Sequence, residues 1–432
     1  MSDRERCGGE QACRHRGLRG ASRRLVSRRR FISLAAGALL VACRQAEATP
    51  SDMLPSAAAP TASPPVATAT LSSATAAPTV AATRPATTAP TLAPPPPAPA
   101  LSRVAVARAA SYDRATIRQQ VRALLDGIGG LGDVVSPGDR VAIKVNLTGG
   151  NHFSAPSGLK ATESHMTHPE VVRALCEHLR DAGARELYIV EAIYDEQSFR
   201  LNGYEEVAAD LGARLIDLNS PRPYSDFVQK PVGGGWLIYE SFFLNRILEG
   251  VDTFASVAKM KCHCRCGVTH SMKNLIGLVP TAHYRVGADD WWRSALHGPD
   301  RETGTRLPRV VIDLNRARPI HLALIDGVMT GEAGEVPRGA FAPVRPEVLV
   351  AGKDPVAADA VATALMGFDP EAQYPAAPFL NGDNHLNLAR ALGLGTNRLA
   401  EIEVSGPPLA ELRHEFKPCR SEMGLLWGEP RP

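Results

Sequence analysis

One stretch near the middle of the chain, residues 257–277, concentrates side chains that bind metals, move protons and hold anions. It contains three cysteines, two histidines and three lysines: Cys262, Cys264, Cys266, His263, His270, Lys259, Lys261 and Lys273. The apolar run 254–258 in front of it predicts a buried strand. If that strand stays extended to Cys266, the cysteines share one face and Lys261 and His263 share the other, because side chains alternate along a strand.

The three cysteines, Cys262, Cys264 and Cys266, are the predicted metal ligands. Soft thiolates this close can share one metal ion or an iron–sulfur cluster if the chain bends at Gly267. Their spacing differs from the C-x-x-C pattern of ferredoxins and zinc sites, so two alternatives stay open. The cysteines are inert and buried, or one forms a disulfide, for which Cys419 is a better partner than a strained bridge between neighbours.

Several other predicted strands end in a charged or amide side chain. The strand 140–145 ends in Lys144 and Asn146, and the strand 320–325 is followed by Asp326. Glu191 and the pair at 353–354 follow two further strands. Because ligands in open α/β sheets bind beyond the carboxyl ends of the strands, we predict a polar site at this edge. The alternative is that strand ends meet water and collect polar residues for that reason alone.

Nucleotide-binding motifs are not supported. The glycines at 127–132 fit G-x-G-x-x-G, but they follow a predicted helix, where glycine ends the helix and makes a turn. The glycine-rich loop 331–339 lacks the lysine of a P-loop. It either wraps a ligand with its backbone N–H groups or is a flexible surface loop. We therefore expect neither a nicotinamide cofactor nor a P-loop nucleotide.

The N-terminal region carries an export signal. Residues 27–32 resemble the twin-arginine motif, the apolar run 31–42 is too short to span a bilayer, and residues 40–43 resemble a bacterial lipobox. Residues 1–43 are thus a predicted signal peptide, cleaved before Cys43, whose thiol is then lipidated. The alternative is a plain signal with an incidental cysteine. We predict an extracytoplasmic protein, exported by the twin-arginine route and lipid-anchored to a membrane.

Composition separates a linker from a folded domain. Residues 44–100 are mainly Ala, Pro, Thr and Ser, a composition that cannot bury enough surface to fold, so we predict a disordered linker. The formal net charge of the chain is +3. Residues 1–43 contribute +7, so the remaining residues carry a net charge of −4. A nucleic-acid partner is therefore not expected, because binding phosphates needs a basic surface.

From residue 101 onward, strand-like and helix-like segments alternate. This order predicts an α/β fold, with a mostly parallel or mixed sheet flanked by helices, in one domain over 101–432. The predicted strands are 103–107, 140–145, 186–190, 214–217, 254–258, 320–325 and 348–350. The predicted helices are 116–125, 169–181, 204–211 and 354–366.

Over about residues 101–400 the chain resembles a bacterial and archaeal family called domain of unknown function 362. The motifs that carry the resemblance are 141–147, 167–172, 259–263, 272–277, His297, 325–327 and 354–359. The resemblance implies an association with iron–sulfur proteins, which is frequent in the family. Members have a small hydroxyl residue where Cys262 stands and an Asn-Gly-Pro turn near residues 332–335, so the resemblance carries no metal role over to the cysteines.

Two functional hypotheses follow. The first is a redox or metal-dependent enzyme, a possible oxidoreductase, that acts on a small anionic molecule with an iron–sulfur cluster or another metal as cofactor. Its predicted catalytic residues are His263, Lys261, Lys273 and Asp326, and its predicted substrate-binding residues are Lys144, Asn146, Asn274, His297, Asp354 and Asp359. The alternative is a non-catalytic lipoprotein that binds such a ligand or docks on a membrane complex.

Overall fold

The structure is a computed structural model that describes residues 101–420, apart from the side chains of residues 300, 301 and 303. The predicted signal peptide, linker and lipidated Cys43 lie outside the described residues. No helix in the described part of the chain is both long and apolar enough to cross a membrane.

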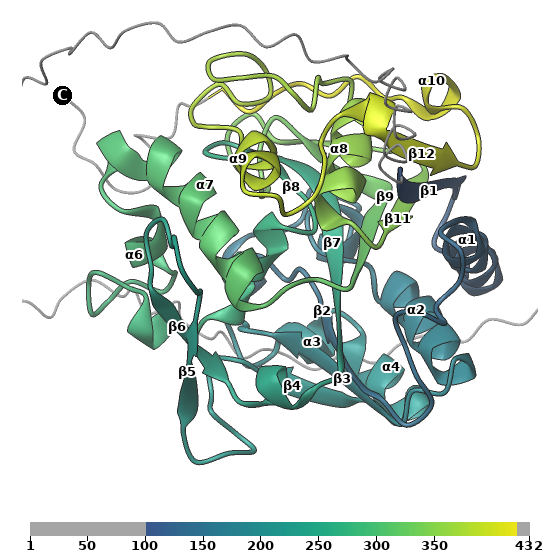
Figure 1. The fold of residues 1–432 in the computed structure, drawn as a ribbon, viewed down its shortest axis with the longest axis horizontal. Helices are drawn as coiled ribbons and strands as arrows, with labels where there is room; N and C mark the ends of the chain where they lie inside the picture. The colour runs from purple at the N-terminus through teal and green to yellow at the C-terminus, as the bar shows by residue number, and fades with distance from the viewer. Residues whose placement is uncertain (1–100, 421–432) are drawn as a thin grey trace, which may run out of the picture. The chain divides into compact units, whose positions relative to one another are not determined.

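The described residues form a mixed sheet of ten strands, in which eight follow the order β12-β1-β11-β9-β7-β2-β3-β4 (Figure 1). The other two, β8 and β10, pair with β7 and β9. The strands are β1 (Ser102–Arg108), β2 (Arg140–Lys144), β3 (Glu186–Glu191), β4 (Arg214–Asp217), β7 (Thr253–His263), β8 (Gly267–Thr269), β9 (Leu322–Glu332), β10 (Ala342–Val344), β11 (Val348–Gly352) and β12 (Ile402–Ser405). A separate hairpin joins β5 (Phe227–Pro231) to β6 (Ser241–Asn245).

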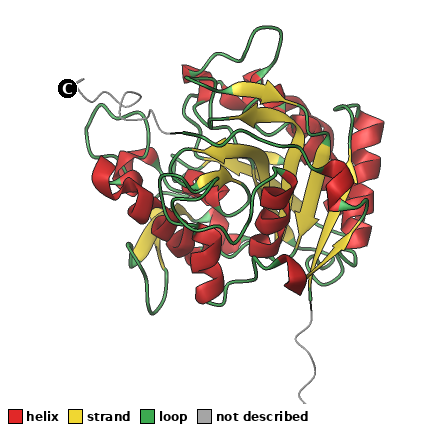
Figure 2. Ribbon diagram, turned by 90° about the horizontal axis from the view of Figure 1, so that it is seen from above, coloured by secondary structure: helices red, strands yellow, loops and turns green. Residues whose placement is uncertain are grey.

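Helices cover both faces of the sheet (Figure 2). On one face, α1 (Arg114–Gly127), α2 (Pro169–Asp181) and α4 (Tyr204–Leu211) pack in one hydrophobic core. On the other, α7 (Asp300–Ala317), α8 (Pro355–Leu365) and α9 (His385–Ala391) pack in a second. Short helices complete the set: α3 (Ser198–Leu201), α5 (Ile247–Gly250), α6 (Ser294–His297), α10 (Leu409–Leu412) and the 3-10 helices η1 (Gly150–His152), η2 (Ala161–Glu163), η3 (Lys273–Leu278), η4 (Thr281–His283) and η5 (Leu399–Glu401).

Local signals in the sequence explain where the helices next to the sheet edge begin. Asp354 caps α8, since its side chain accepts hydrogen bonds from the backbone N–H groups of Val356 and Ala357. His168 caps α2 in the same way through Glu170 N. Each cap is followed by proline, whose fixed φ suits the first helical position.

The central strands β2, β3 and β7 run parallel, so their carboxyl ends reach one edge together. All eleven residues of β7 are buried, because helices cover both faces of its sheet. The strand ends at His263, and the chain turns at residues 264–266 into β8. The strand therefore does not stay extended to Cys266, and the turn is completed by Gly267, whose φ of 73° favours glycine.

The predicted fold class, α/β with a mixed sheet flanked by helices, is confirmed. The helices α2 and α4 and the strand β4 have the predicted bounds. The sequence did not reveal α7, which contains Pro308, a residue that normally interrupts a helix.

Candidate functional site

A cavity lies at the carboxyl ends of β2, β3 and β7. Its volume is about 80 Å³, whereas one water needs about 10–15 Å³ by the same measure. The residues that line it are Lys144, Asn146, Thr148, Gly149, Phe153, Glu191, Tyr194, Lys261, His263, Thr269, Lys273, Asn274, Ile276, Gly277, Trp291, Trp292, Arg293, His297, Glu335 and Val336. Seven of the predicted catalytic or substrate-binding residues are among them: Lys144, Asn146, Lys261, His263, Lys273, Asn274 and His297.

A buried ion pair forms one wall of the cavity. The Nζ atom of Lys144, at the end of β2, lies 2.9 Å from the carboxylate of Glu191, at the end of β3. Burial lowers the pKa of Lys144 to about 8 and raises that of Glu191, because both groups lose water. Gly277 of η3 packs on this pair so closely that a Cβ atom there would overlap both charged groups.

Two amides order the same wall. Asn274 Oδ1 accepts hydrogen bonds from Lys144 Nζ at 3.2 Å and from Asn146 Nδ2 at 3.1 Å. The Nδ2 group of Asn274 in turn donates to Ser256 Oγ at 3.1 Å. With its oxygen and its nitrogen both engaged, Asn274 holds η3 against the ends of β2 and β7.

Lys261 is the buried lysine whose charge is easiest to change. Its Nζ atom donates to the carbonyl oxygen of His165 at 2.7 Å, and its side chain is fully buried. Burial lowers its pKa to about 7, while the carboxylate of Glu335 opposes that shift. A lysine with this pKa can both accept and donate a proton near neutral pH.

Lys273 brings a cation that has no close partner among the described residues. No hydrogen-bond acceptor or carboxylate of these residues contacts its ammonium group. It begins η3 and is 8% exposed. Burial lowers its pKa, and the nearby Cys266 and Glu335 oppose that shift. A buried cation without a close partner attracts an anionic ligand, because the protein around it screens charge less than bulk water does.

His263 and Glu335 form a hydrogen-bonded pair. Nδ1 of His263 accepts hydrogen bonds from the backbone N–H groups of Arg265 and Cys266, at 3.1 and 3.2 Å. The proton therefore resides on Nε2, which lies 3.1 Å from the carboxylate of Glu335. Burial, with Lys273 nearby, keeps the pKa of His263 well below its usual value. The ring thus acts as a neutral donor that orients Glu335.

An aromatic rim closes the cavity beside His297. Trp291 stacks on His152 at 4.2 Å between ring centroids and meets Tyr194 edge-on at 5.4 Å. Nδ1 of His297 lies 3.1 Å from the carbonyl oxygen of Arg293. Since a carbonyl only accepts, Nδ1 carries the proton, and Nε2 is left as an acceptor. Burial lowers the pKa of His297 to about 3, so the ring is neutral at pH 7.

The structure places Asp326, a predicted catalytic residue, outside the cavity lining. Its carboxylate pairs with Lys259 Nζ at 2.7 Å, and both side chains are fully buried. Asp326 also accepts hydrogen bonds from Tyr112 Oη and from the backbone N–H of His168, at the start of α2. Its oxygens are thus engaged in joining β9, β7 and α2.

Asp354 and Asp359, two predicted substrate-binding residues, also lie away from the cavity lining. Asp354 caps α8, as described above. Asp359, inside α8, accepts hydrogen bonds from the backbone N–H groups of Ser271 and Met272. Burial raises the pKa of Asp359 to about 7, against the effect of these donors. Asp359 thus fixes the segment that leads into Lys273, while making no contribution to the cavity lining.

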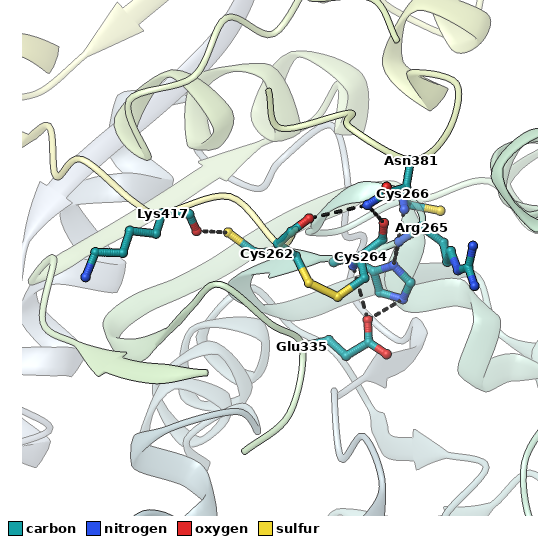
Figure 3. Close-up of a disulfide and its surroundings, with 9 residues drawn as sticks. Cys262, Cys264, Arg265, Cys266, Glu335, Asn381 and Lys417 are labelled. Atoms are coloured by element: carbon teal, nitrogen blue, oxygen red, sulfur yellow. Dashed lines mark hydrogen bonds and ion pairs between the residues drawn. A yellow bond between two sulfur atoms is a disulfide. The ribbon is translucent and has the colours of Figure 1, made fainter. Parts of the chain in front are cut away.

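The three predicted metal ligands adopt different states (Figure 3). Cys264 forms a disulfide with Cys419, one of the alternatives that the sequence left open. Cys262 and Cys266 are free and buried. Within residues 101–420, no group of three or more His, Cys, Asp or Glu side chains is arranged to hold a metal ion. In the oxidised chain the cluster therefore does not present three thiolates, and an iron–sulfur cluster or other metal stays a prediction.

Glu335, Arg293 and Tyr194 are lining residues to which the sequence gave no role. Glu335 belongs to the loop 331–339, for which the sequence left open a backbone ligand cradle or a flexible surface loop. Arg293 follows the paired tryptophans and donates from its side chain to the carbonyl oxygens of Val279 and Ala192, at 2.6 and 2.7 Å. No local pattern signals these residues, because segments far apart in the sequence meet here.

Comparison with known proteins supports the resemblance found in the sequence. A family model described as a domain of unknown function (DUF362) matches residues 141–364, which is more than half of the chain. The chain belongs to the DUF362 family. A thylakoid-associated protein of Synechocystis sp. is 26% identical to it over 274 residues, covering 62% of this chain and 75% of that relative.

Two solved structures align with lower similarity. One is a protein of Thermotoga maritima, 13% identical, with a TM-score of 0.29 and a coverage of 55% of this chain and 56% of that chain. The other is the lactate racemase apoprotein of Thermoanaerobacterium thermosaccharolyticum, 11% identical, with a TM-score of 0.29 and coverages of 57% and 54%. The alignments span little over half of either solved chain, and at this TM-score neither bears on function.

Proposed function

We propose that this DUF362 protein is an exported, lipid-anchored protein whose cavity binds a small anionic molecule and exchanges a proton with it through Lys261. Lys273 holds the anionic group, and Lys261 gives or takes the proton. His263 and Glu335 set the charge around Lys261, while Asn146 and Asn274 order the opposite wall.

The observation that carries the proposal is the unpaired ammonium group of Lys273 in the same cavity as Lys261. Four cations line the cavity, Lys144, Lys261, Lys273 and Arg293, against the carboxylates of Glu191 and Glu335. Below a pH of about 7, where Lys261 is charged, positive charge is in excess. Such fixed charges in a buried site stabilise an anion and the charge that develops when a proton moves.

Two further observations support the proposed location. The disulfide between Cys264 and Cys419 suits an oxidising compartment outside the cytoplasm. The thylakoid-associated relative is, by its name, found with a membrane. Both agree with the twin-arginine and lipobox resemblances of residues 27–43. A globomycin-sensitive mobility shift of the full chain, absent in Cys43→Ala, tests the anchor.

Calorimetric titration with small carboxylates and phosphates at pH 6 tests anion binding. We expect binding by the native chain and by Lys353→Met, which removes a lysine outside the cavity, and weak or no binding by Lys273→Met. Equal affinity of the native chain and Lys273→Met would rule out the proposed anion site.

Deuterium incorporation tests the proton transfer. A bound anion incubated in D₂O should exchange a carbon-bound hydrogen with the native protein and lose this exchange with Lys261→Met, as followed by proton NMR. Binding without exchange by any ligand of the panel would instead favour the non-catalytic alternative, a lipoprotein that captures its anion without converting it.

A further inference from the structure

The end of the described chain lies across the loop that carries Glu335. We call residues 413–420 the C-terminal strap. Glu332 accepts a hydrogen bond from the backbone N–H of Lys417 at 2.8 Å. The N–H of Ala333 donates to the carbonyl oxygen of Lys417 at 2.9 Å, and the thiol of Cys262 donates to the same oxygen at 3.3 Å. The strap is therefore bonded to the loop 332–335 and to the end of β7.

A disulfide fastens this strap to the turn after β7 (Figure 3). Cys419 of the strap is bonded to Cys264. The side-chain amide of Asn381 contacts the carbonyl oxygens of both residues, at 3.0 Å from Cys264 and 3.4 Å from Cys419. Cys264 and Cys419 are 155 residues apart in sequence, so the covalent bond joins two segments that are distant along the chain.

The same turn holds the carboxylate of Glu335. The backbone N–H of Cys264 lies 3.4 Å from Glu335 Oε2, the oxygen that also contacts Nε2 of His263. Glu335 in turn lines the cavity, and its charge opposes the loss of the proton from Lys261. A path of contacts thus runs from the disulfide through the turn to Glu335, which lines the same cavity as Lys261.

We propose that the Cys264–Cys419 disulfide is a redox-sensitive fastener, cleaved by an extracytoplasmic dithiol reductant, whose cleavage frees the strap and releases Glu335 from its place beside Lys261. The dithiol loses two electrons and two protons and becomes a disulfide. Cys264 and Cys419 gain them and become two thiols. The effect on catalysis rests on the proposed role of Lys261, whereas the release of the strap does not.

The neighbouring thiols do not reshuffle this bond by themselves. Burial raises the pKa of Cys262 and Cys266 to about 12, so at neutral pH almost none of either is the thiolate that attacks a disulfide. Cys264 and Cys419 are only 5% and 4% exposed, so a reductant in solution has little access to their disulfide. Cleavage therefore needs a dithiol that binds against the strap, or a local opening of the strap that exposes the disulfide.

Hydrogen exchange of the folded protein tests the release. The chain would be compared before and after treatment with a dithiol, with thiol counting to show that two thiols have appeared. We expect the amides of Ala333 and Lys417 to exchange about tenfold faster or more after reduction, because both bonds join the strap to the loop. Cys176→Ser, which removes a free buried cysteine in α2, is the control and should respond like the native chain.

The backbone amide of Cys264, which lies 3.4 Å from Glu335 Oε2, tests the coupling to the turn. We expect this amide also to exchange faster after reduction and in Cys419→Ser. Native-like exchange at Ala333 and Lys417 in reduced protein would overturn the proposal, as would purified chain without the disulfide. None of these readouts needs a bound anion, so they stand apart from the proposed function.

Discussion

Two lysines of the same strand occupy contrasting environments. Lys259 and Lys261 are two residues apart on β7, and both are fully buried. The ammonium group of Lys259 donates to Tyr112 Oη, to the carbonyl oxygens of Thr162 and Met329, and to Asp326. That of Lys261 donates only to the carbonyl oxygen of His165 among the described residues.

An irregularity in the sheet separates the two environments. Lys259 lies opposite Asp326 on β9, whereas Lys261 lies opposite Gly331, so the register shifts between them. Such bulges redirect side chains and are common beside active sites. The comparison teaches that a charged side chain near a strand end is not by itself functional. Lys259, with a full set of partners, joins β7 to β9, whereas Lys261, with few, is the lysine to which we assign the proton transfer.

The largest expected effect is on stability, and it comes from Lys259, the lysine with the full set of partners. Lys259→Met leaves the carboxylate of Asp326 buried without its cation, which typically costs about 3–5 kcal/mol. Urea unfolding followed by circular dichroism measures the change. Lys261→Met, which removes a lysine that burial already disfavours, should cost much less than Lys259→Met or stabilise the chain. Equal losses in the two variants would erase the distinction.

The next largest effect is on the affinity of the cavity for an anion. Lys273→Met removes the unpaired cation of the cavity, and a hydrogen bond to a charged group is worth about 1.5–3 kcal/mol. Anion affinity should therefore fall about 10–100-fold. Calorimetric titration at pH 6 measures this affinity. A variant of Lys259 is unsuitable as a control, because the substitution affects folding. Lys353→Met serves instead, since Lys353 lies outside the cavity lining.

The third effect is a pH dependence that belongs to Lys261. As pH rises through about 7, Lys261 loses its proton, the cavity loses a positive charge, and anion affinity should fall. Titrations from pH 5.5 to 7.5 should show this step in the native chain and not in Lys261→Met, because Lys144, with a pKa of about 8, loses its proton mostly above this range.

Stability should respond to Lys261 with the opposite sign. Between pH 7 and the ordinary lysine pKa of about 10.4, the unfolded chain binds a proton that the folded chain has released, so the contribution of Lys261 to the free energy of unfolding rises with pH. The difference between the unfolding curves of the native chain and Lys261→Met, measured at pH 6, 7 and 8, shows this contribution.

The smallest effect sets the baseline for the comparison. Lys353 pairs with Asp133, whose side chain is 66% exposed. Surface pairs of this kind contribute about 0–1 kcal/mol, so Lys353→Gln should change the urea midpoint little. Addition of 0.5 M salt should reduce even that difference, whereas the loss in Lys259→Met should persist, because salt screens exposed charges more than buried ones. A large loss in Lys353→Gln would show that partner number alone does not separate these lysines.

Much of the site was predictable because its signals are local. Lys144, Asn146, Lys261 and Lys273 meet in one cavity, as strand ends in a parallel arrangement lead one to expect. Asp354 has two predicted roles, since an aspartate before proline is both a strand-end carboxylate and a helix cap. The structure confirms that it caps α8, and its role in substrate binding stays a prediction.

By itself the sequence determined the α/β fold class, the family and the group of lysines at one sheet edge, because periodicity, caps and strand polarity act between near neighbours. Only the tertiary structure decided that Lys259 is neutralised by Asp326, that Cys264 is bonded to Cys419, and that Glu335 reaches the cavity. Each of these depends on which distant segment arrives beside a given side chain. Burial then determines the consequence, since a charge or thiol removed from water is governed by the few groups that it touches.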